Sequence, residues 1–219
     1  MKKYLVIGNP IDHSLSPKLH NYWLKKNNID AIYEKQELNI NDLQKFILRI
    51  KKEEINGANV TIPFKQKIIP YLDELSSEAS DTQSVNTIYL SNHKVVGHNT
   101  DISGFEFALK DTQFKVSGKK IFIIGAGGVV PSIIYALNKM KVLSISLSNR
   151  TISKAENLKN LFKNINILEW GKIPDFDIII NATSIGLKND DKIDLDFSKV
   201  EKGKLFYDVI YNPSETNFL

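Results

Sequence analysis

The sequence predicts an α/β fold with two domains, and three observations support this. Strand-like and helix-like segments alternate along the chain, which is the pattern of α/β proteins. The pattern starts a second time after the turn Ser117–Lys119, where an apolar strand leads directly into a cluster of glycines. At 219 residues the chain is long enough for two small domains. We place their boundary at Asp101, which gives expected domains of residues 1–101 and 102–219.

The first domain begins with strands and helices in alternation. Short apolar runs indicate strands, and amphipathic runs indicate helices. Two further strand-like runs, separated by a short polar segment, follow near the end of the domain. The expected strands are Tyr4–Ile7, Ile32–Leu38, Ala58–Ile62, Thr87–Leu90 and Lys94–Gly97, and the expected helices are Pro17–Lys26, Asp42–Lys51 and a helical stretch near Gln66–Glu74.

The second domain is predicted to be a doubly wound, Rossmann-like sheet, because strands and helices keep alternating after the glycine cluster. The helix Ile102–Lys110 is expected to connect the two domains. After it we expect strands at Ile121–Ile124, Ile145–Leu147, Ile165–Leu168, Ile178–Asn181 and Leu205–Val209, and helices at Pro131–Met140 and Lys154–Leu161.

The composition excludes several classes of protein and of site. Hydrophobic residues make up 42% of the chain and charged residues 25%, which are ordinary proportions for a globular protein. The formal charge of +4 is spread along the sequence, so we expect no nucleic-acid partner. There is no cysteine, and the four histidines lack a metal-ligand spacing, so we expect no metal site. The apolar runs have the length of strands and no signal peptide is recognised, so we expect a cytoplasmic protein without a membrane partner.

The glycine cluster Gly125–Gly128 stands between a strand and a helix, which is the context of a dinucleotide-binding site. Gly125 permits a tight turn, and Gly127 allows the backbone to approach a pyrophosphate at the positive end of the next helix. The pattern is imperfect, because Val130 stands where a small residue is usual, and a structural turn without a ligand is the alternative. The expected cofactor contacts here are Gly125, Ala126, Gly127, Gly128 and Val129.

The residues after the next strand favour NADP over NAD. NAD-binding units place an acidic residue there, about twenty residues beyond the glycines, to bind the ribose hydroxyls. In this sequence the positions hold Asn149, Arg150 and Thr151, and a guanidinium can grip a 2′-phosphate that a carboxylate would repel. Thr151 and Lys154 can add donors. The alternative is that Thr151 or Ser153 only caps the next helix.

Polar residues at segment ends of the first domain suggest a ligand site. Ser14 and Ser16 precede a helix with Pro17 at its first position, so Ser16 is the expected N-cap. Two hydroxyls and a helix dipole make a small anion site suited to a carboxylate, with a plain helix cap as the alternative. Lys65 follows a strand, and amides, hydroxyls and a carboxylate end other segments, although turn chemistry also accounts for such groups.

Several motifs occur in order along essentially the whole chain: GNPIDHSLSP (8–17), GANVTIPFK (57–65), SVNT (84–87), NTD (99–101), IGAGGVV (124–130), SNRT (148–151), INATSIG (180–186) and YDVIYNP (207–213). In this order they resemble the shikimate dehydrogenase family. The resemblance implies an N-terminal substrate domain, a C-terminal NADP domain and a cleft between them. It also implies the reversible NADP-dependent oxidation of shikimate to 3-dehydroshikimate in chorismate biosynthesis.

The resemblance also implies roles for residues that match its motifs. Ser14 and Ser16 would hold the substrate carboxylate, while Thr61, Asn86 and Asp101 would bind the ring hydroxyls. More weakly, Tyr211 would reach the substrate, and the strand end Asn181, Ala182 and Thr183 would lie beside the cofactor.

Lys65 would be the catalytic group by the same resemblance, with Asp101 orienting it. The chemistry agrees, because loss of a hydride from an alcohol requires its hydroxyl proton to leave. Lys65 can take that proton or stabilise the charge that develops.

The family normally continues beyond the passage that residues 212–219 resemble, with helices that return to the substrate domain and carry a substrate-contacting glutamine. We expect a chain without them to fold with weakened catalysis, and to lose more affinity for shikimate than for the cofactor. Three functions are therefore considered: an active shikimate dehydrogenase, a related enzyme that uses quinate or NAD, and a non-catalytic binding protein. Lys65 and Asp101 favour an enzyme, Arg150 favours NADP, and a homodimer is left open.

Overall fold

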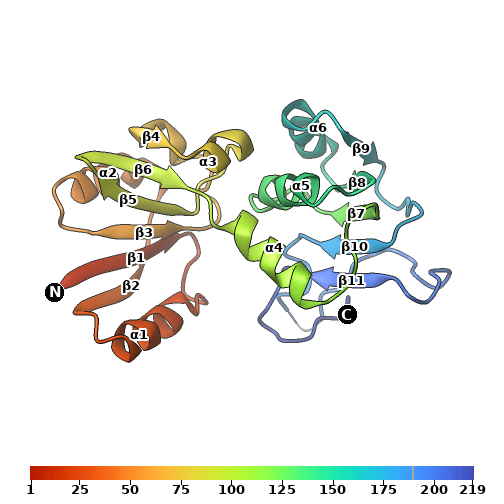
Figure 1. Cartoon of the computed structure of the whole chain (residues 1–219), viewed down its shortest axis with the longest axis horizontal. Helices are drawn as coiled ribbons and strands as arrows, with labels where there is room; N and C mark the ends of the chain where they lie inside the picture. Colours follow the sequence, from red (N-terminus) through yellow and green to blue (C-terminus); the bar gives the residue numbers. More distant parts are fainter. Residues whose placement is uncertain (189) are drawn as a thin grey trace. The chain divides into compact units, whose positions relative to one another are not determined.

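The computed structural model describes residues 1–188 and 190–219, which divide into two compact units, Met1–Asp101 and Ile102–Leu219 (Figure 1). Each unit is built around one sheet, of six strands in the first unit and five in the second. The predicted α/β fold is confirmed. In the first unit the strands are β1 (Lys2–Gly8), β2 (Ala31–Glu37), β3 (Gly57–Val60), β4 (Glu74–Leu75), β5 (Thr87–Ser91) and β6 (Lys94–His98), and the helices are α1 (Ser16–Lys26), α2 (Leu43–Lys51) and α3 (Ser77–Thr82).

The sheet of the first unit is mixed, with the strand order β2-β1-β3-β5-β6-β4. β1 pairs in parallel with β2 and β3, whereas β5 runs antiparallel to both of its neighbours, β3 and β6. This reversal places the start of β5 beside the end of β3, because antiparallel neighbours meet head to tail. The polar residues that end β3 and begin β5 are therefore neighbours in space.

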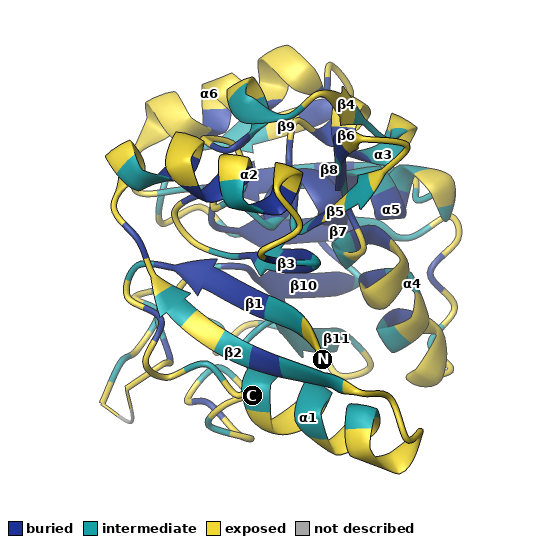
Figure 2. Ribbon diagram, turned by 90° about the vertical axis from the view of Figure 1, so that its left-hand side faces the viewer, coloured by how far each residue is buried: buried dark blue, intermediate teal, exposed yellow. Residues whose placement is uncertain are grey.

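The two faces of this sheet are covered differently. Helix α2 buries four apolar residues at helical spacing, Leu43, Phe46, Ile47 and Ile50, and they share a core with Leu5 and Ile7 of β1. Val6, between the two, points to the opposite face, as the alternation of a strand requires. Helix α1 on that face has no fully buried residue, and Figure 2 accordingly shows it in teal and yellow.

His20 of α1 stacks on Tyr33 of β2, with ring centroids 4.2 Å apart and 6° between the ring planes. Burial lowers the pKa of His20 below 6.5, so the unfolded chain takes up this proton at a higher pH than the folded chain does. We expect the free energy of unfolding to decrease as the pH falls below about 6.5 toward the lowered pKa. Urea midpoints at about pH 7.5 and about pH 5 should therefore differ less in His20→Phe than in the wild type, and equal differences would contradict this assignment.

The predicted helical stretch Gln66–Glu74 is wrong. It forms turns with one short 3-10 helix, Ile69–Tyr71, and runs into β4. Pro70 has no backbone N–H to donate and is tolerated only in the first turn of a helix, which prevents a longer α-helix here. A helix that was not predicted, α3, follows instead, and the hydroxyl of Ser76 caps it by accepting the N–H of Ala79 at 3.2 Å.

The sheet of the second unit is entirely parallel, with the strand order β11-β10-β7-β8-β9. The first strand of this unit, β7, is central, and β8 and β9 follow on one side of it. The later strands β10 and β11 lie on the other side. The order of strands thus reverses between β7 and β10, and ligands of such sheets bind at this point, outside the carboxyl ends of the strands. The strands are β7 (Lys120–Ile124), β8 (Ser144–Ser148), β9 (Ile165–Leu168), β10 (Ile178–Asn181) and β11 (Leu205–Asp208), and the helices are α4 (Asp101–Asp111), α5 (Val130–Lys139) and α6 (Ile152–Leu161).

Apolar residues fill both faces of this sheet. Ile121 and Ile123 of β7 point to the face that carries residues of α4, α5 and α6. Phe122 and Ile124 point to the other face. There they pack with Phe176, which precedes β10, and with several partly buried apolar side chains. Among the described residues no helix covers this second face. The sheet is nevertheless buried on both sides, as a parallel sheet requires.

Candidate functional site

Lys65 lies in the turn that follows β3. Its neighbour Phe64 is buried in the core, and the carbonyl of Lys65 accepts the N–H of Val85 at 2.9 Å, so the backbone is fixed on both sides. The lysine side chain is only 12% exposed, and its Nζ lies 2.6 Å from Oδ2 of Asp101. Solvent ions screen such a partly buried pair less than a surface pair. The position of the amine is therefore set by Asp101.

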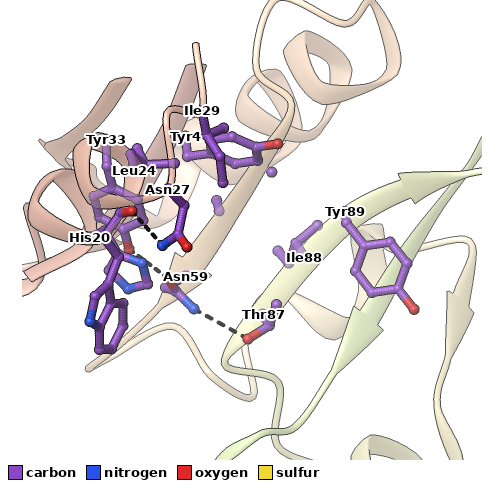
Figure 3. Close-up of a pocket in the computed structure, with 13 residues that line it drawn as sticks. Tyr4, His20, Leu24, Asn27, Ile29, Tyr33, Asn59, Thr87, Ile88 and Tyr89 are labelled. Atoms are coloured by element: carbon purple, nitrogen blue, oxygen red, sulfur yellow. Dashed lines mark hydrogen bonds between the residues drawn. The ribbon is translucent and has the colours of Figure 1, made fainter. Parts of the chain in front are cut away.

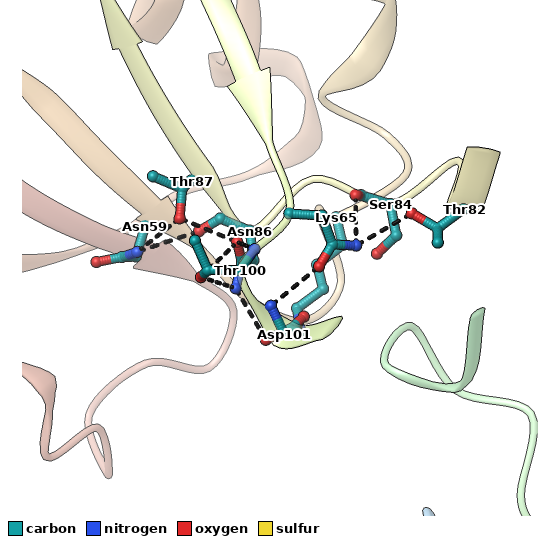
Figure 4. Close-up of polar contacts among 9 residues, drawn as sticks. Asn59, Lys65, Thr82, Ser84, Asn86, Thr87, Thr100 and Asp101 are labelled. Carbon is teal, nitrogen blue, oxygen red and sulfur yellow. Dashed lines mark hydrogen bonds and ion pairs between the residues drawn. The ribbon is translucent and has the colours of Figure 1, made fainter. Parts of the chain in front are cut away.

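Asp101, the first residue of α4, receives a donor on each carboxylate oxygen. Lys65 donates to Oδ2, and Nδ2 of Asn86 donates to Oδ1 at 2.8 Å (Figure 4). Nδ2 of Asn86 also donates to Oγ1 of Thr100 at 2.9 Å, and its Oδ1 accepts the N–H of Thr100 at 2.9 Å. The structure thus brings Lys65, Asn86 and Asp101 into one hydrogen-bonded group, which we call the lysine cluster.

Asn99 is buried next to the lysine cluster and holds the backbone of Asp101. It is 3% exposed, and its Oδ1 accepts the N–H of Asp101 at 3.0 Å. Its Nδ2 donates to Oγ1 of Thr82 at 3.1 Å and to the carbonyl of Ser84 at 2.9 Å. A buried amide with partners on both sides fixes the backbone at the start of α4. From the sequence, Asn99 and Thr100 were recognised only as part of the NTD motif and were given no role of their own.

Ser14 and Ser16 lie at the N-terminal end of α1, and both are half-buried. The predicted N-cap is wrong by one residue, because the helix begins at Ser16 and Leu15 occupies the cap position without a side-chain bond. Instead, Oγ of Ser14 accepts the N–H of Ser16 at 3.3 Å. Since the oxygen accepts this bond, the hydroxyl proton of Ser14 remains available to a ligand.

Thr61 lies just beyond β3, where its N–H donates to the carbonyl of Ile7 at 2.9 Å. A Cβ atom at Gly8 would lie 2.6 Å from Cγ2 of Thr61, so only glycine fits beside this side chain. Within the described residues, Thr61 shares no hydrogen bond with the lysine cluster. It is held by β1 instead, separately from Asn86 and Asp101.

The glycine turn after β7 meets the end of β10. Gly125 has a φ of +112°, and a Cβ atom there would lie 2.7 Å from the carbonyl oxygen of Ala182, so both the conformation and the space require glycine. At Gly127, which is exposed, a Cβ atom would lie 3.6 Å from the same oxygen, which is an ordinary contact. The protein itself does not need glycine there, and its absent side chain leaves room for a ligand. Val130 is fully buried, so the fold accommodates this departure from the pattern.

Arg150, Thr151 and Lys154 are exposed at the end of β8 and the start of α6. Thr151 occupies the N-cap position, but its side chain makes no cap hydrogen bond. Nδ2 of Asn149 donates to the carbonyl of Thr151 at 2.8 Å and shapes the turn. No ion pair of Arg150 occurs in the described part of the chain. The guanidinium is therefore available to an anion. Because Thr151 makes no cap hydrogen bond, helix capping does not explain its presence here.

Asn181 is fully buried at the end of β10 and joins it to β11. Its Nδ2 donates to Oδ2 of Asp208 at 3.0 Å, and its Oδ1 accepts both the N–H and the hydroxyl of Thr183. Asp208 also accepts the hydroxyl of Thr216 at 2.7 Å. Asp208 thus fixes the strand end whose carbonyl faces the glycine turn, and sequence reasoning missed it. Tyr211, which follows, is 72% exposed and lies beyond the strand.

Neither a metal-binding cluster nor a membrane-spanning helix is found among the described residues. No group of three or more histidine, cysteine or acidic side chains there is placed to hold a metal ion. None of the helices described has both the length and the apolar character needed to cross a membrane.

Comparison with known protein families and relatives matches both units. Residues 6–88 match the shikimate dehydrogenase substrate binding domain, and residues 106–206 match the shikimate / quinate 5-dehydrogenase family. A shikimate dehydrogenase (NADP(+)) of Pelagibacter ubique is 58% identical over 218 residues, which covers the whole chain and 82% of that relative.

Solved structures agree in fold. A shikimate dehydrogenase in complex with NADP⁺ matches with a TM-score of 0.94 and 34% identity, over the whole chain and 80% of that protein. Shikimate 5-dehydrogenase from Thermus thermophilus, in complex with NADP(H) and shikimate, matches with a TM-score of 0.87 and 27% identity, over 97% of this chain and 80% of that protein. Since the identity to the Pelagibacter protein extends over the full chain, this chain belongs to the shikimate dehydrogenase family.

Proposed function

We propose that the chain catalyses the reversible, NADP-dependent oxidation of shikimate to 3-dehydroshikimate. Membership of the family supports the reaction, and the lysine cluster is the observation that carries it. In this proposal residues 1–101 bind the substrate and residues 102–219 bind NADP.

The substrate is held at both ends. Ser14 and Ser16 donate to its carboxylate, aided by the positive end of the α1 dipole. Thr61, Asn86 and Asp101 bind the ring hydroxyls. Tyr211 adds a contact to the substrate, for which its 72% exposure leaves it available.

Lys65 moves the proton. In the oxidation direction Nζ takes the hydroxyl proton or stabilises the charge that develops on that oxygen while the hydride leaves the same carbon, and Asp101 orients Nζ. In the reduction direction the ammonium returns the proton to the developing alkoxide. Bound NADP supplies the hydride acceptor, and NADPH the donor. The 2.6 Å contact between Nζ and Oδ2 supports the orienting role of Asp101.

The residues of the second unit fit NADP. The open backbone at Gly127, with Ala126, Gly128 and Val129 around it, approaches the pyrophosphate at the N-terminal end of α5, a helix of ten residues. Gly125 makes the turn that allows this. When NADP is bound, its 2′-phosphate would be held by Asn149, Arg150, Thr151 and Lys154, and the strand end Asn181, Ala182 and Thr183 would contact the cofactor.

A spectrophotometric assay tests the proposal. Reduction of NADP should be seen with shikimate, and the rate with NAD at equal concentration should be lower. Quinate serves as the competing substrate. No reduction of either cofactor with shikimate would refute the proposal, and faster turnover of quinate would reassign the substrate.

Arg150→Ala should raise KM for NADP while leaving KM for NAD nearly unchanged, because the guanidinium binds a group that only NADP carries. Loss of hydrogen bonds from a charged group costs about 1.5–3 kcal/mol, so the expected increase is about ten- to a hundredfold. Lys159→Ala, an exposed lysine in the last turn of α6, is the matched control and should change neither value. Equal increases for both cofactors would show that Arg150 is structural.

A further inference from the structure

A chain of hydrogen bonds leads from Tyr33 into the lysine cluster. The hydroxyl of Tyr33 donates to Oδ1 of Asn59 at 2.6 Å, and Nδ2 of Asn59 donates to Oγ1 of Thr87 at 3.2 Å (Figure 3). Oγ1 of Thr87 donates to Oδ1 of Asn86 at 2.9 Å, and Asn86 donates to Asp101 (Figure 4). Three strands, β2, β3 and β5, are thus connected to the carboxylate that holds Lys65.

The register of the sheet creates this chain. Asn59 and Thr87 are directly opposite each other in the antiparallel pair of β3 and β5, where the side chains of paired residues are close enough to interact. Both are half-buried, so solvent competes only in part for their hydrogen bonds.

The direction of each bond follows from what each partner can donate. The backbone carbonyl of Asn86 can only accept, and Nδ2 of Asn59 faces it at 3.2 Å, which turns Oδ1 of Asn59 toward Tyr33. Nδ2 of Asn59 also donates to Thr87, so the single hydroxyl proton of Thr87 is directed to Oδ1 of Asn86. This bond and the N–H of Thr100, which also donates to Oδ1 of Asn86, both place the NH₂ group of Asn86 toward Asp101.

The first donor of the chain is firmly held. Tyr33 lies on the outer strand β2, and the side chain of Asn21 from α1 bonds both its N–H, at 2.9 Å, and its carbonyl, at 2.7 Å. His20 stacks on the ring (Figure 3). Burial also raises the pKa of Tyr33 well above its ordinary value, so the phenol keeps its proton and remains a donor at physiological pH.

We propose that Tyr33, Asn59 and Thr87 are positioning residues, which fix the amide orientation of Asn86 and thereby the place of Asp101 and Lys65. This inference rests on the proposed function of the lysine cluster. The three residues act through Asn86 and not on the substrate. Without the hydroxyl of Thr87, Oδ1 of Asn86 keeps the N–H of Thr100 as a donor but loses a second one, so the amide that holds Asp101 is placed less firmly. Displacement of a catalytic group by about 1 Å can cost about a hundredfold in rate.

Thr87→Val and Thr87→Ser test the inference as a matched pair. Valine keeps the shape of threonine without the hydroxyl, and serine keeps the hydroxyl without the methyl group. Thr87→Val should lower kcat for shikimate by about ten- to a hundredfold, while Thr87→Ser should stay within about threefold of the wild type. KM for NADP should be unchanged in both. Thermal melting is measured alongside, and if Thr87→Val does not fold, Tyr33→Phe replaces it, because it removes a single oxygen and should lower kcat by about two- to fivefold.

Two further variants separate this inference from the proposed function. Tyr89→Phe removes a hydroxyl from an exposed tyrosine of β5 and should leave kcat unchanged. A fully active Lys65→Ala would refute the role of the lysine itself. Loss of activity in Lys65→Ala with wild-type kcat in Thr87→Val would overturn only the positioning chain. Equal losses in Thr87→Val and Thr87→Ser would also overturn it, because the hydroxyl would then not be the group that matters.

Discussion

Lys65→Ala is expected to lower kcat for shikimate oxidation by about 10²- to 10⁴-fold, the usual contribution of general acid–base catalysis. KM for shikimate should change much less, because the proton moves only as the transition state is reached and uniform binding is little affected. The fold should survive, since the backbone at Lys65 is held by the buried Phe64 and by the hydrogen bond from Val85, and neither depends on the lysine side chain. Steady-state kinetics at saturating NADP measure the effect.

Lys67→Ala is the matched control for this experiment. Lys67 lies two residues further along the same turn, is exposed, and carries the same charge. Its removal should leave kcat unchanged. If both variants lost activity to a similar extent, the local charge rather than Lys65 would be responsible, and a wild-type kcat in Lys65→Ala would remove the lysine from the mechanism.

The second sheet could be predicted strand by strand because each of its strands is a short apolar run. Ile121–Ile124 and Ile178–Asn181 are buried on both faces, so their hydrophobicity is continuous and their boundaries are clear. The glycine turn was recognised for the same reason, since it follows such a run directly. Its physical cause, the carbonyl of Ala182 2.7 Å from a Cβ atom at Gly125, depends on the pairing of β7 with β10 and could not be seen in the sequence.

The region between β3 and β5 was predicted less well. Around Pro70 the apolar residues recur at intervals that suggest a helix, but tertiary packing and the missing N–H group select a short 3-10 turn. Helix α3 has only six residues, too few for a hydrophobic period to be recognised.

The lysine cluster shows which part of a site the sequence can reveal. Lys65, Asn86 and Asp101 were identified because they belong to motifs, and their identification needed no knowledge of the sheet. Asn59 and Thr87 belong to the same motifs, yet their contact arises only because β5 runs antiparallel to β3 in one particular register. A shift by one residue would place Thr87 on the opposite face of the sheet from Asn59. Supporting contacts of this kind depend on register, and register cannot be read from a single sequence here.

The double variant Ser14→Ala with Ser16→Ala is expected to raise KM for shikimate by about 10²- to 10⁴-fold, with a smaller change in kcat. The two hydroxyls are proposed to donate to a carboxylate remote from the reacting carbon, and loss of two hydrogen bonds to a charged group costs about 3–6 kcal/mol. Oγ of Ser14 also accepts the N–H of Ser16, so the double variant removes a hydrogen bond at the start of α1 as well. Thermal melting must therefore accompany the kinetics. KM for NADP should not change.

An uncharged substrate distinguishes loss of the carboxylate contact from general damage. A shikimate analogue with a carboxamide in place of the carboxylate should bind the wild type more weakly than shikimate does, and the double variant should weaken its binding further by no more than about tenfold, because hydrogen bonds to uncharged groups are the weaker ones. Ser91→Ala, an exposed serine at the end of β5, is the control and should alter neither KM. If the double variant weakened binding of the carboxamide as much as that of shikimate, the serines would act through the fold of α1. An unchanged KM for shikimate would place the substrate carboxylate elsewhere.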